Sequence, residues 1–410
     1  MSILDRLSDP ARWADFYRHK LEQGTLRERE AADLRRFIEA EEYRPAVEQI
    51  LAGCRFPLPE KRLVNKTEVG RKRTVYTYPR EENYVLKFLA HQLRDYDGLF
   101  PGNLYSFRSS LSVRDAVDTV RRRRCAGRLF VYKTDISDYF RSVDIARLLP
   151  MLHAALADDE RLYRFLKELL ENREALWQGQ IIREDKGIVP GAPISSFLAN
   201  LYLCDMDRAF EERGVLYLRY SDDIIVFAET RDQLETYRAQ IRRFLDEKKL
   251  TINPEKEQVF TPGQAWNFLG FSFSGETVDV SDVSVQKLKA KMRRKARALK
   301  RWADKKGAPG TAAARAFLKR FNAKLFENPS HNELTWARWF FPVINTDASL
   351  RRIDRYEMEC VRFLATGKRT KGRFAFTYED AKALGYRNLV NEYYRFKRRA
   401  NGSDDPSDGL

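Results

Sequence analysis

The sequence contains few of the residues on which disulfide, zinc and histidine chemistry depend. Its 410 residues include 4 cysteines and 4 histidines, scattered along the chain without a Cys-x-x-Cys pair. This argues against a zinc site or a histidine-based triad, and it favours reduced thiols in a cytoplasmic protein. There is also no apolar run long enough to span a bilayer, and the first residues do not read as a signal peptide.

Positive charge, by contrast, is in excess. The chain has 75 Lys and Arg against 59 Asp and Glu, a formal net charge of +16, and 43% hydrophobic residues. This composition is typical of a folded protein with two or three subdomains and a polyanionic partner, for which nucleic acid ranks ahead of a membrane surface.

An acidic doublet is the central feature of the sequence. Asp222 and Asp223 lie between the apolar runs 216–220 and 224–227, which predicts a β-hairpin with both acids near its tip. An Asp-Asp pair taken alone is more often a solvated turn. Asp135, however, ends a second apolar strand, and in one antiparallel sheet it would face the doublet. Three carboxylates brought together in this way would hold two Mg²⁺ ions, or Mn²⁺, for an in-line displacement at a phosphoryl group.

Several basic segments surround this core, and each has a plain alternative. The strand 71–80 suits a triphosphate or template backbone, or is a charged edge strand. Residues 1–53 read as helices that either contact RNA or cap the core. The helix from 285 onward has an apolar stripe through Leu288, Met292 and Ala296 among many cations, more than a solvated face needs, which favours binding to a duplex backbone.

The order of motifs from Lys66 to Phe273 resembles the palm of reverse transcriptases. The resemblance implies metal ligation by Asp135, Asp222, Asp223 and the carbonyl of Ile136, with Lys256 assisting the leaving pyrophosphate. It also implies nucleotide contacts, in which Phe140 is the steric gate that selects dNTPs, and contacts to primer and template. The nucleotide-binding residues are then Lys66, Arg73, Phe140 and Gly191, and the primer or template residues are Tyr220, Phe268, Leu269, Gly270, Lys291, Arg294 and Arg297.

One motif departs from the family pattern. Where the family usually has Pro-Gln-Gly, this chain has Val189-Pro190-Gly191. The glutamine normally lies against the sugar of the nucleotide, so the resemblance implies unusual nucleotide affinity or fidelity.

The fold implied is an α+β right-hand polymerase with fingers, a palm built on an antiparallel sheet and a helical thumb. The expected domains are a helical N-terminal extension (1–55), fingers and palm (56–280), a basic thumb (281–328), a family-specific C-terminal region (329–400) and a tail (401–410).

The C-terminal region sets the expected lineage within the bacterial retron and group II intron-like superfamily. Arg355-Tyr356, Leu364–Lys368 and Leu384–Tyr386 are similar to defence-associated reverse transcriptases of the unknown groups, class 2. That resemblance implies an antiphage role with a cognate non-coding RNA as template, a cDNA product and dNTPs as substrates. Two alternatives stay open, an RNA-dependent RNA polymerase and a non-catalytic RNA-binding protein on the same fold.

Overall fold

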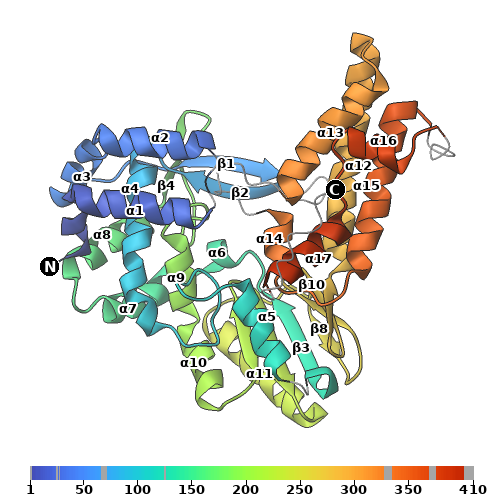
Figure 1. Ribbon diagram of the computed structural model, residues 1–410. Coiled ribbons are helices and arrows are strands. Elements are labelled where there is room, and N and C mark those ends of the chain that lie inside the picture. Colours follow the sequence, from blue (N-terminus) through green and yellow to red (C-terminus); the bar gives the residue numbers. More distant parts are fainter. Residues whose placement is uncertain are drawn as a thin grey trace. The chain divides into compact units, whose positions relative to one another are not determined.

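The computed structural model describes residues 2–24, 26, 28–65, 72–123, 126–326, 335–368 and 375–400. The chain divides into two compact units, Met1–Pro262 and Gly263–Leu410. Helices and largely antiparallel sheets occur in both units, which confirms the predicted α+β class (Figure 1). Among the described residues, no helix combines the length and apolar character needed to cross a bilayer.

The first unit begins with helices, as predicted, and they belong to its core. The ring of Trp13 lies stacked between those of Tyr43 and Phe88, with its centroid 4.5 Å from that of Tyr43 and 4.3 Å from that of Phe88. The N-terminal helices are therefore packed onto the helix that follows the first hairpin (Figure 1). The elements are η1 (Ile3–Ser8), α1 (Pro10–Glu22), α2 (Glu28–Glu39), α3 (Arg44–Leu51), α4 (Arg80–Gln92) and η2 (Leu93–Leu99).

A first sheet of four strands has the order β2-β1-β4-β5, with β1 (Glu60–Asn65), β2 (Lys72–Thr77), β4 (Glu174–Trp177) and β5 (Gln180–Arg183). The apolar spacing over 145–177 predicts helix throughout, and the second hairpin of this sheet corrects that expectation. Helices α7 (Ile145–Ala155) and α8 (Glu160–Glu171) end before it. Gln178 and Gly179 then both take positive φ, the geometry of a two-residue hairpin turn, so the chain reverses as a strand pair.

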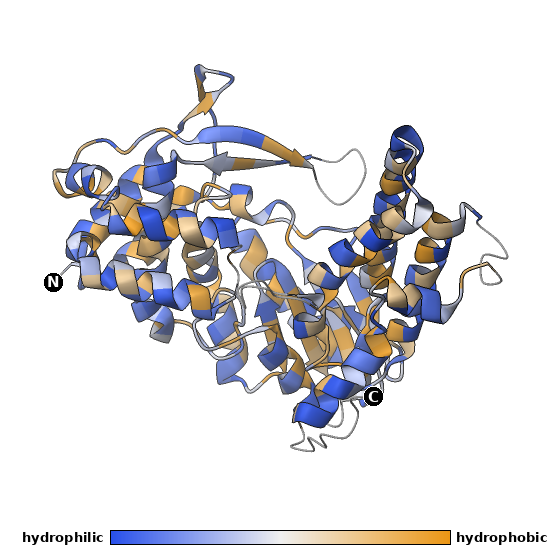
Figure 2. Ribbon diagram, turned by 45° about the horizontal axis from the view of Figure 1, so that its top comes forward, coloured by the Kyte–Doolittle hydropathy of each residue, from blue (hydrophilic) through white to orange (hydrophobic). Residues whose placement is uncertain are grey.

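The second sheet has the order β6-β7-β3-β8 and carries the acidic residues. Its strands β3 (Phe130–Asp135), β6 (Tyr217–Tyr220), β7 (Asp223–Ala228) and β8 (Gln258–Phe260) pair antiparallel, as the sequence predicted for the two acidic segments. Hydrophobic residues run along these strands (Figure 2). The remaining helices of the unit are α5 (Val113–Arg122), η3 (Ala126–Arg128), α6 (Tyr139–Ser142), α9 (Ser195–Tyr202), α10 (Cys204–Glu212) and α11 (Arg231–Glu247).

The second unit joins a small sheet to a group of helices. Strands β9 (Trp266–Phe268), β10 (Phe271–Ser274) and β11 (Thr277–Val280) precede the long helix α12 (Asp282–Lys306). Leu288, Met292 and Ala296 of the predicted apolar stripe are buried on α12. The other helices are α13 (Gly310–Leu325), α14 (Trp336–Phe340), α15 (Ala348–Thr366), α16 (Tyr378–Ala383) and α17 (Leu389–Ala400). The predicted domain boundaries at 55, 280 and 328 stay predictions.

Candidate metal centre

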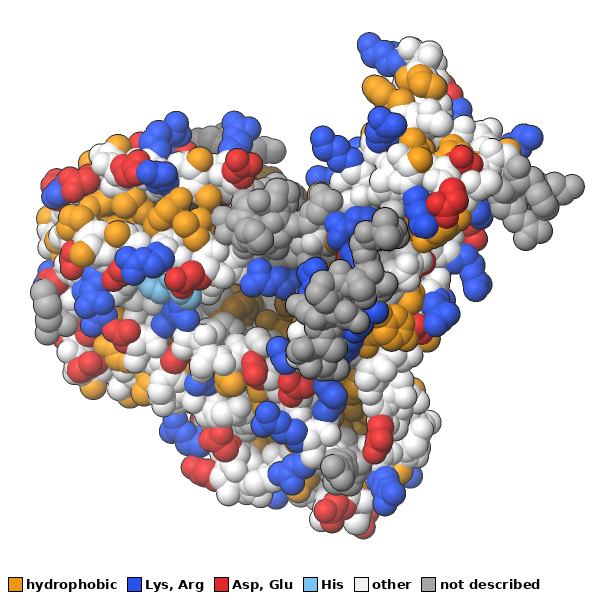
Figure 3. Space-filling model, in the orientation of Figure 1, with side chains coloured by type: hydrophobic (Ala, Val, Ile, Leu, Met, Phe, Trp, Pro, Cys, Tyr) orange, Lys and Arg blue, Asp and Glu red, His pale blue; other side chains and the backbone are white. Residues whose placement is uncertain are grey.

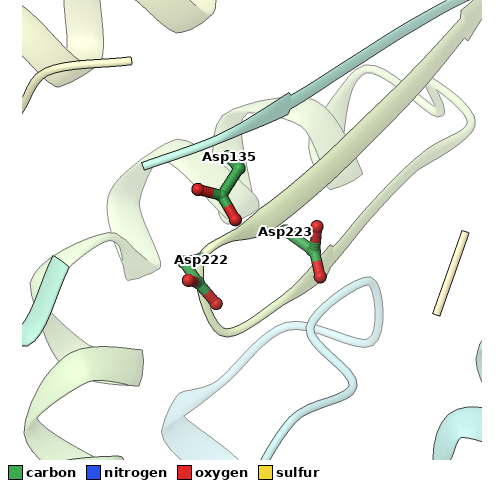
Figure 4. Close-up of side chains that lie close together, drawn as sticks. All are labelled: Asp135, Asp222 and Asp223. Atoms are coloured by element: carbon green, nitrogen blue, oxygen red, sulfur yellow. The ribbon is translucent and has the colours of Figure 1, made fainter. Parts of the chain in front are cut away.

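Three carboxylates meet at one end of the second sheet. Asp135 is the last residue of β3, and the register places it opposite Asp223, the first residue of β7. Asp222 occupies the turn between β6 and β7. One carboxylate oxygen from each of the three residues lies within 4.8 Å of the others (Figure 4). The predicted convergence of acids from two distant segments is therefore confirmed.

Backbone hydrogen bonds hold the acidic segments in this register. The N–H of Ile136 donates to the carbonyl oxygen of Asp222 at 3.2 Å, which ties the end of β3 directly to the acidic turn. On the other side, the N–H of Asn253 donates to the carbonyl oxygen of Asp135 at 2.8 Å. Asp135 is thus fixed between two neighbouring segments before any ion binds.

The electrostatics of the cluster show the cost of bringing three acids together. Burial, together with the charges of Asp135 and Asp223, raises the pKa of Asp222 to about 6. Burial also raises the pKa of Asp223, although the nearby charge of Lys133 opposes this. A divalent cation would remove the repulsion, because it favours the ionised form of every carboxylate that it contacts.

Lys256 contacts the acidic cluster. Its Nζ donates to Oδ2 of Asp135 at 2.6 Å, while its side chain stays 57% exposed. Burial lowers the pKa of Lys256, but the hydrogen bond and charge of Asp135 outweigh this effect and the pKa is raised. The lysine is therefore a charged, solvent-accessible group beside the acids, and its role at the leaving pyrophosphate stays a prediction.

A buried ion pair supports the acidic turn between β6 and β7. Arg219 and Asp207 are fully buried, and the guanidinium Nε donates to Oδ1 of Asp207 at 2.7 Å. The same guanidinium donates to the carbonyl oxygens of Ser221 and Asn200, each at 3.1 Å. Ser221 has a φ of +61°, a left-handed conformation that is strained for serine. The ion pair thus fixes the residue immediately before Asp222.

A second contact holds the other side of this turn. The N–H of Ser221 donates to Oγ of Ser106 at 2.8 Å, and that hydroxyl donates to Oδ1 of Asn200 at 3.1 Å. In addition, the N–H of Tyr105 donates to the carbonyl oxygen of Arg219 at 3.0 Å. The segment around residues 103–106 therefore forms part of the site's support.

Sequence reasoning missed this support, although one signal for it was present. Arg219 interrupts an otherwise apolar strand, and a charge in a buried strand requires a partner. The identity of that partner, Asp207 on α10, follows only from the packing of α10 against β6.

The residues present fit a pair of hard divalent cations. Mg²⁺ binds oxygen ligands at about 2.0–2.1 Å, so one ion brings two oxygens to about 4 Å or less, and two ions about 3.5–4 Å apart reach further. Oxygens within 4.8 Å of one another meet this requirement with little adjustment. Asp135, Asp222 and Asp223 would hold the ions.

Three of the predicted nucleotide-binding residues, Arg73, Phe140 and Gly191, lie in the Gly/Pro loop or on segments that contact it. The N–H of Tyr76 on β2 donates to the carbonyl oxygen of Pro190 at 2.7 Å, and the N–H of Ile188 donates to that of Phe140 at 2.9 Å. The loop therefore joins the strand that carries the exposed Arg73 to the backbone of Phe140. A Cβ on Gly191, whose φ is +101°, would lie 2.7 Å from the carbonyl oxygen of Tyr76, so glycine is required there. Lys66 lies outside the described residues.

The predicted primer and template residues are divided between the two units. Tyr220 is half-buried at the end of β6. In the second unit, Phe268 is buried, and Leu269 and Gly270 form the partly exposed turn between β9 and β10, both with positive φ. Three exposed cations on α12 follow one another at helical spacing: Lys291, Arg294 and Arg297.

Comparison with known proteins identifies what the site resembles. A family model described as reverse transcriptase (RNA-dependent DNA polymerase) matches residues 65–273. Retron Mx65 reverse transcriptase of Myxococcus xanthus is 30% identical over 181 residues, which cover 42% of this chain and 42% of that protein. Retron Ec86 reverse transcriptase of Escherichia coli is 22% identical over 226 residues, covering 54% of this chain and 65% of that protein. The chain therefore matches less than two thirds of the length of either relative.

Solved structures give weaker likenesses. Apo telomerase from Candida tropicalis, truncated from its C-terminal domain, is 14% identical with a TM-score of 0.45, over 54% of this chain and 55% of that one. Telomerase from Candida albicans in complex with a fragment of telomeric RNA is 12% identical with a TM-score of 0.44, over 91% and 69%. TM-scores this low support no inference about this chain.

Proposed function

Because the chain belongs to the reverse transcriptase family, we propose that it is an RNA-directed DNA polymerase that uses two Mg²⁺ ions. The observation that carries this proposal is the meeting of Asp135, Asp222 and Asp223 within the segment that the family model matches. A protein that only binds RNA would gain nothing from three acids at this point, since they repel a polyanion.

In the proposed reaction, the primer 3′-hydroxyl loses its proton to solvent and its oxygen attacks the α-phosphorus of a dNTP. A new P–O bond forms, the bond to the β-phosphate breaks and pyrophosphate leaves. When bound, the two ions would supply Lewis acidity at the attacking and leaving oxygens. The chain's acids hold their ligand atoms in place beforehand, because the register of β3 with β7 and the buried ion pair under the turn fix them.

We assign Lys256 the role of neutralising the leaving pyrophosphate by donating a proton to it. Its ammonium lies at Asp135 and remains exposed, so a short rotation of a flexible side chain would bring it to a pyrophosphate oxygen. Proton donation to a leaving group by a positioned side chain is worth about 10²–10⁴ in rate.

Nucleotide selection is assigned to the residues around the Gly/Pro loop. Arg73, with Lys66, would bind the triphosphate, and Gly191 allows the Gly/Pro loop to pack closely against the backbone of Tyr76 on the strand that carries Arg73. The ring of Phe140 would exclude a 2′-hydroxyl and so favour dNTPs over NTPs. Tyr220 of the first unit is assigned to the primer terminus. The Leu269–Gly270 turn of the second unit is assigned a contact to the primer strand, with Phe268 as the buried support of that turn. Lys291, Arg294 and Arg297 would bind phosphates of the duplex without sequence preference.

For the biological setting, we propose that the template is a cognate non-coding RNA and that the cDNA acts in antiphage defence. The resemblance of the C-terminal segments to defence-associated reverse transcriptases supports this, and both curated relatives are retron reverse transcriptases. Sequencing the RNA and DNA that co-purify with the protein tests it. We expect one abundant RNA species and a cDNA complementary to it. A random sample of cellular RNA would contradict the proposal.

A primer-extension assay tests the activity itself. Wild-type protein and the Asp222→Asn/Asp223→Asn variant are incubated with an RNA template, a DNA primer and either dNTPs or NTPs. We expect extension with dNTPs that the double variant lacks. Extension with NTPs instead would indicate an RNA polymerase, and equal incorporation by both proteins would contradict the assignment of the acids.

A further inference from the structure

A group of bases with no carboxylate of the described residues in ion-pair distance lies on helices that contribute nothing to the metal centre. We call it the α1–α4 basic cluster: His19 and Lys20 of α1, Lys87 and His91 of α4, and Arg94 of η2. Over this part of the first unit, histidine side chains lie at the surface with Lys, Arg and acidic side chains beside them (Figure 3).

The contacts within the cluster join bases to bases. Nη1 of Arg94 contacts Nε2 of His19 and lies 3.3 Å from Nδ1 of His91. The two imidazole rings are 4.6 Å apart between centroids. Among the described residues, no carboxylate lies within ion-pair distance of Lys20, Lys87 or Arg94. The guanidinium of Arg94 therefore rests against neutral acceptors, and its charge is not balanced.

Carboxylates close to the cluster are largely engaged elsewhere. Asp95 forms an ion pair with Arg6. Asp33 binds Arg80 and also accepts a hydrogen bond from the hydroxyl of Tyr84. The charges of Glu22, Glu30, Asp33 and Asp95 still offset part of the positive charge. Glu22 acts on His19, Glu30 and Asp33 act on Lys87, and Asp95 acts on His91.

Burial and the neighbouring positive charges both act on the cluster. Burial, followed by the charges of Lys87 and Arg94, lowers the pKa of Lys20. Burial, followed by His19 and Arg94, lowers the pKa of His91 to about 4, so its ring is neutral at pH 7. Aromatic rings hold the two ammonium groups in place, since Nζ of Lys20 lies 5.6 Å from the Phe16 centroid and Nζ of Lys87 lies 4.8 Å from that of Tyr84.

We propose that the α1–α4 basic cluster binds the phosphate backbone of an RNA strand, at a site separate from the metal centre. Three cations carried on two helices and the turn after them suit the repeated phosphates of one strand, and a guanidinium with free N–H groups binds phosphate in a bidentate manner. The choice of RNA over another polyanion rests on the proposed function. The excess of bases in the cluster is observed independently of that function.

The test compares two triple variants with equal loss of charge. The first is Lys20→Gln/Lys87→Gln/Arg94→Gln. The control is Arg164→Gln/Arg231→Gln/Arg243→Gln, three exposed arginines of the same unit to which we assign no role. Binding of a labelled 40-nucleotide single-stranded RNA is measured over a range of salt concentrations. Counterion release amounts to about 0.7 per phosphate contact on a single strand, so three lost contacts flatten the log–log salt slope by about 2. We expect this change, with at least about tenfold weaker binding at low salt, in the cluster variant alone.

A second measurement uses the wild-type protein and does not depend on the folding of a variant. RNA that contains 4-thiouridine is crosslinked to the bound protein, and the crosslinked peptides are identified by mass spectrometry. We expect crosslinks within α1 and around residues 84–95. Equal salt slopes for wild type and cluster variant, with no crosslinks in these segments, would overturn the proposal. The same result is expected if an acidic protein segment, and not RNA, occupies the cluster. Neither measurement requires nucleotide incorporation, so failure of the proposed polymerase activity is seen separately.

Discussion

Replacing Arg219 tests whether the buried ion pair positions the acidic turn or only stabilises the fold. Arg219→Met leaves the carboxylate of Asp207 fully buried without its partner. Breaking such a pair costs about 3–5 kcal/mol, because an uncompensated charge remains in the interior. We therefore expect a large loss of unfolding free energy together with a loss of polymerase activity. This single variant does not distinguish the two roles.

A triple variant separates stability from position. Asp207 also accepts a hydrogen bond from the hydroxyl of Tyr217 at 2.8 Å. Arg219→Met/Asp207→Leu/Tyr217→Phe removes both charges and the hydroxyl together, and such replacements by apolar residues are often neutral or stabilising. We expect stability to return to within about 1–2 kcal/mol of wild type. The carbonyl oxygens of Ser221 and Asn200 still lack their guanidinium donor, however, so Asp222 stays poorly held.

Three measurements are compared for wild type, single variant and triple variant: urea unfolding, Mn²⁺ binding by electron paramagnetic resonance, and single-turnover dNTP incorporation. For the triple variant we expect near wild-type unfolding, weaker Mn²⁺ binding and incorporation slower by at least about tenfold, equivalent to about 1.4 kcal/mol. If the triple variant regains Mn²⁺ affinity and rate along with stability, the positioning argument is refuted.

Other parts of the chain give three further predictions. Gly191→Ala places a Cβ 2.7 Å from the carbonyl oxygen of Tyr76 and should lower kcat/KM for dNTPs at least about tenfold. Gly179→Ala, also at positive φ but with no atom within 4 Å of the added Cβ, should change kcat/KM little. Equal effects of the two substitutions would contradict the role assigned to Gly191. Lys256→Gln should slow single-turnover incorporation by about 10². It should change the unfolding free energy by less than about 1 kcal/mol, since the lysine side chain is 57% exposed. An unchanged rate would exclude Lys256 from the reaction. Burial and the charge of Asp354 raise the pKa of Glu357 from 4.5 to about 8. Between those values the folded carboxyl holds a proton that the unfolded one has lost, so unfolding free energy should fall with rising pH by about 1.4 kcal/mol per unit relative to Glu357→Gln. If the unfolding free energies of wild type and Glu357→Gln, measured with urea from pH 5 to 8, stay a constant amount apart, this prediction is refuted.

The sequence predicted the features of the site that depend on local pattern. Asp222 and Asp223 were placed at a hairpin because apolar strand residues flank them, and Asp135 was matched to them because it too ends an apolar strand. Antiparallel pairing of these segments follows from the alternation of strand and turn signals, and the structure has this pairing. The three-acid site could thus be inferred without coordinates.

The contacts that hold the site were not predictable in the same way. Nothing local in the sequence connects Arg219 with Asp207 or Ser106 with Ser221, because these contacts depend on how α10 and the segment before α5 pack against β6. The hairpin of β4 and β5 was also missed, since the apolar spacing before it continues a helical pattern and only the Gln178-Gly179 turn indicates the reversal. The α1–α4 basic cluster likewise depends on packing, which places bases from three elements side by side.

The most direct test of the central claim counts the divalent ions held by the three acids. Mn²⁺ is titrated into the protein with an RNA template, a dideoxy-terminated primer and the matching dNTP, and bound ions are counted by electron paramagnetic resonance. We expect about two ions per chain for wild type and fewer than about one for Asp135→Asn/Asp222→Asn. The same number of bound ions in both proteins would contradict the claim that Asp135, Asp222 and Asp223 form the metal centre.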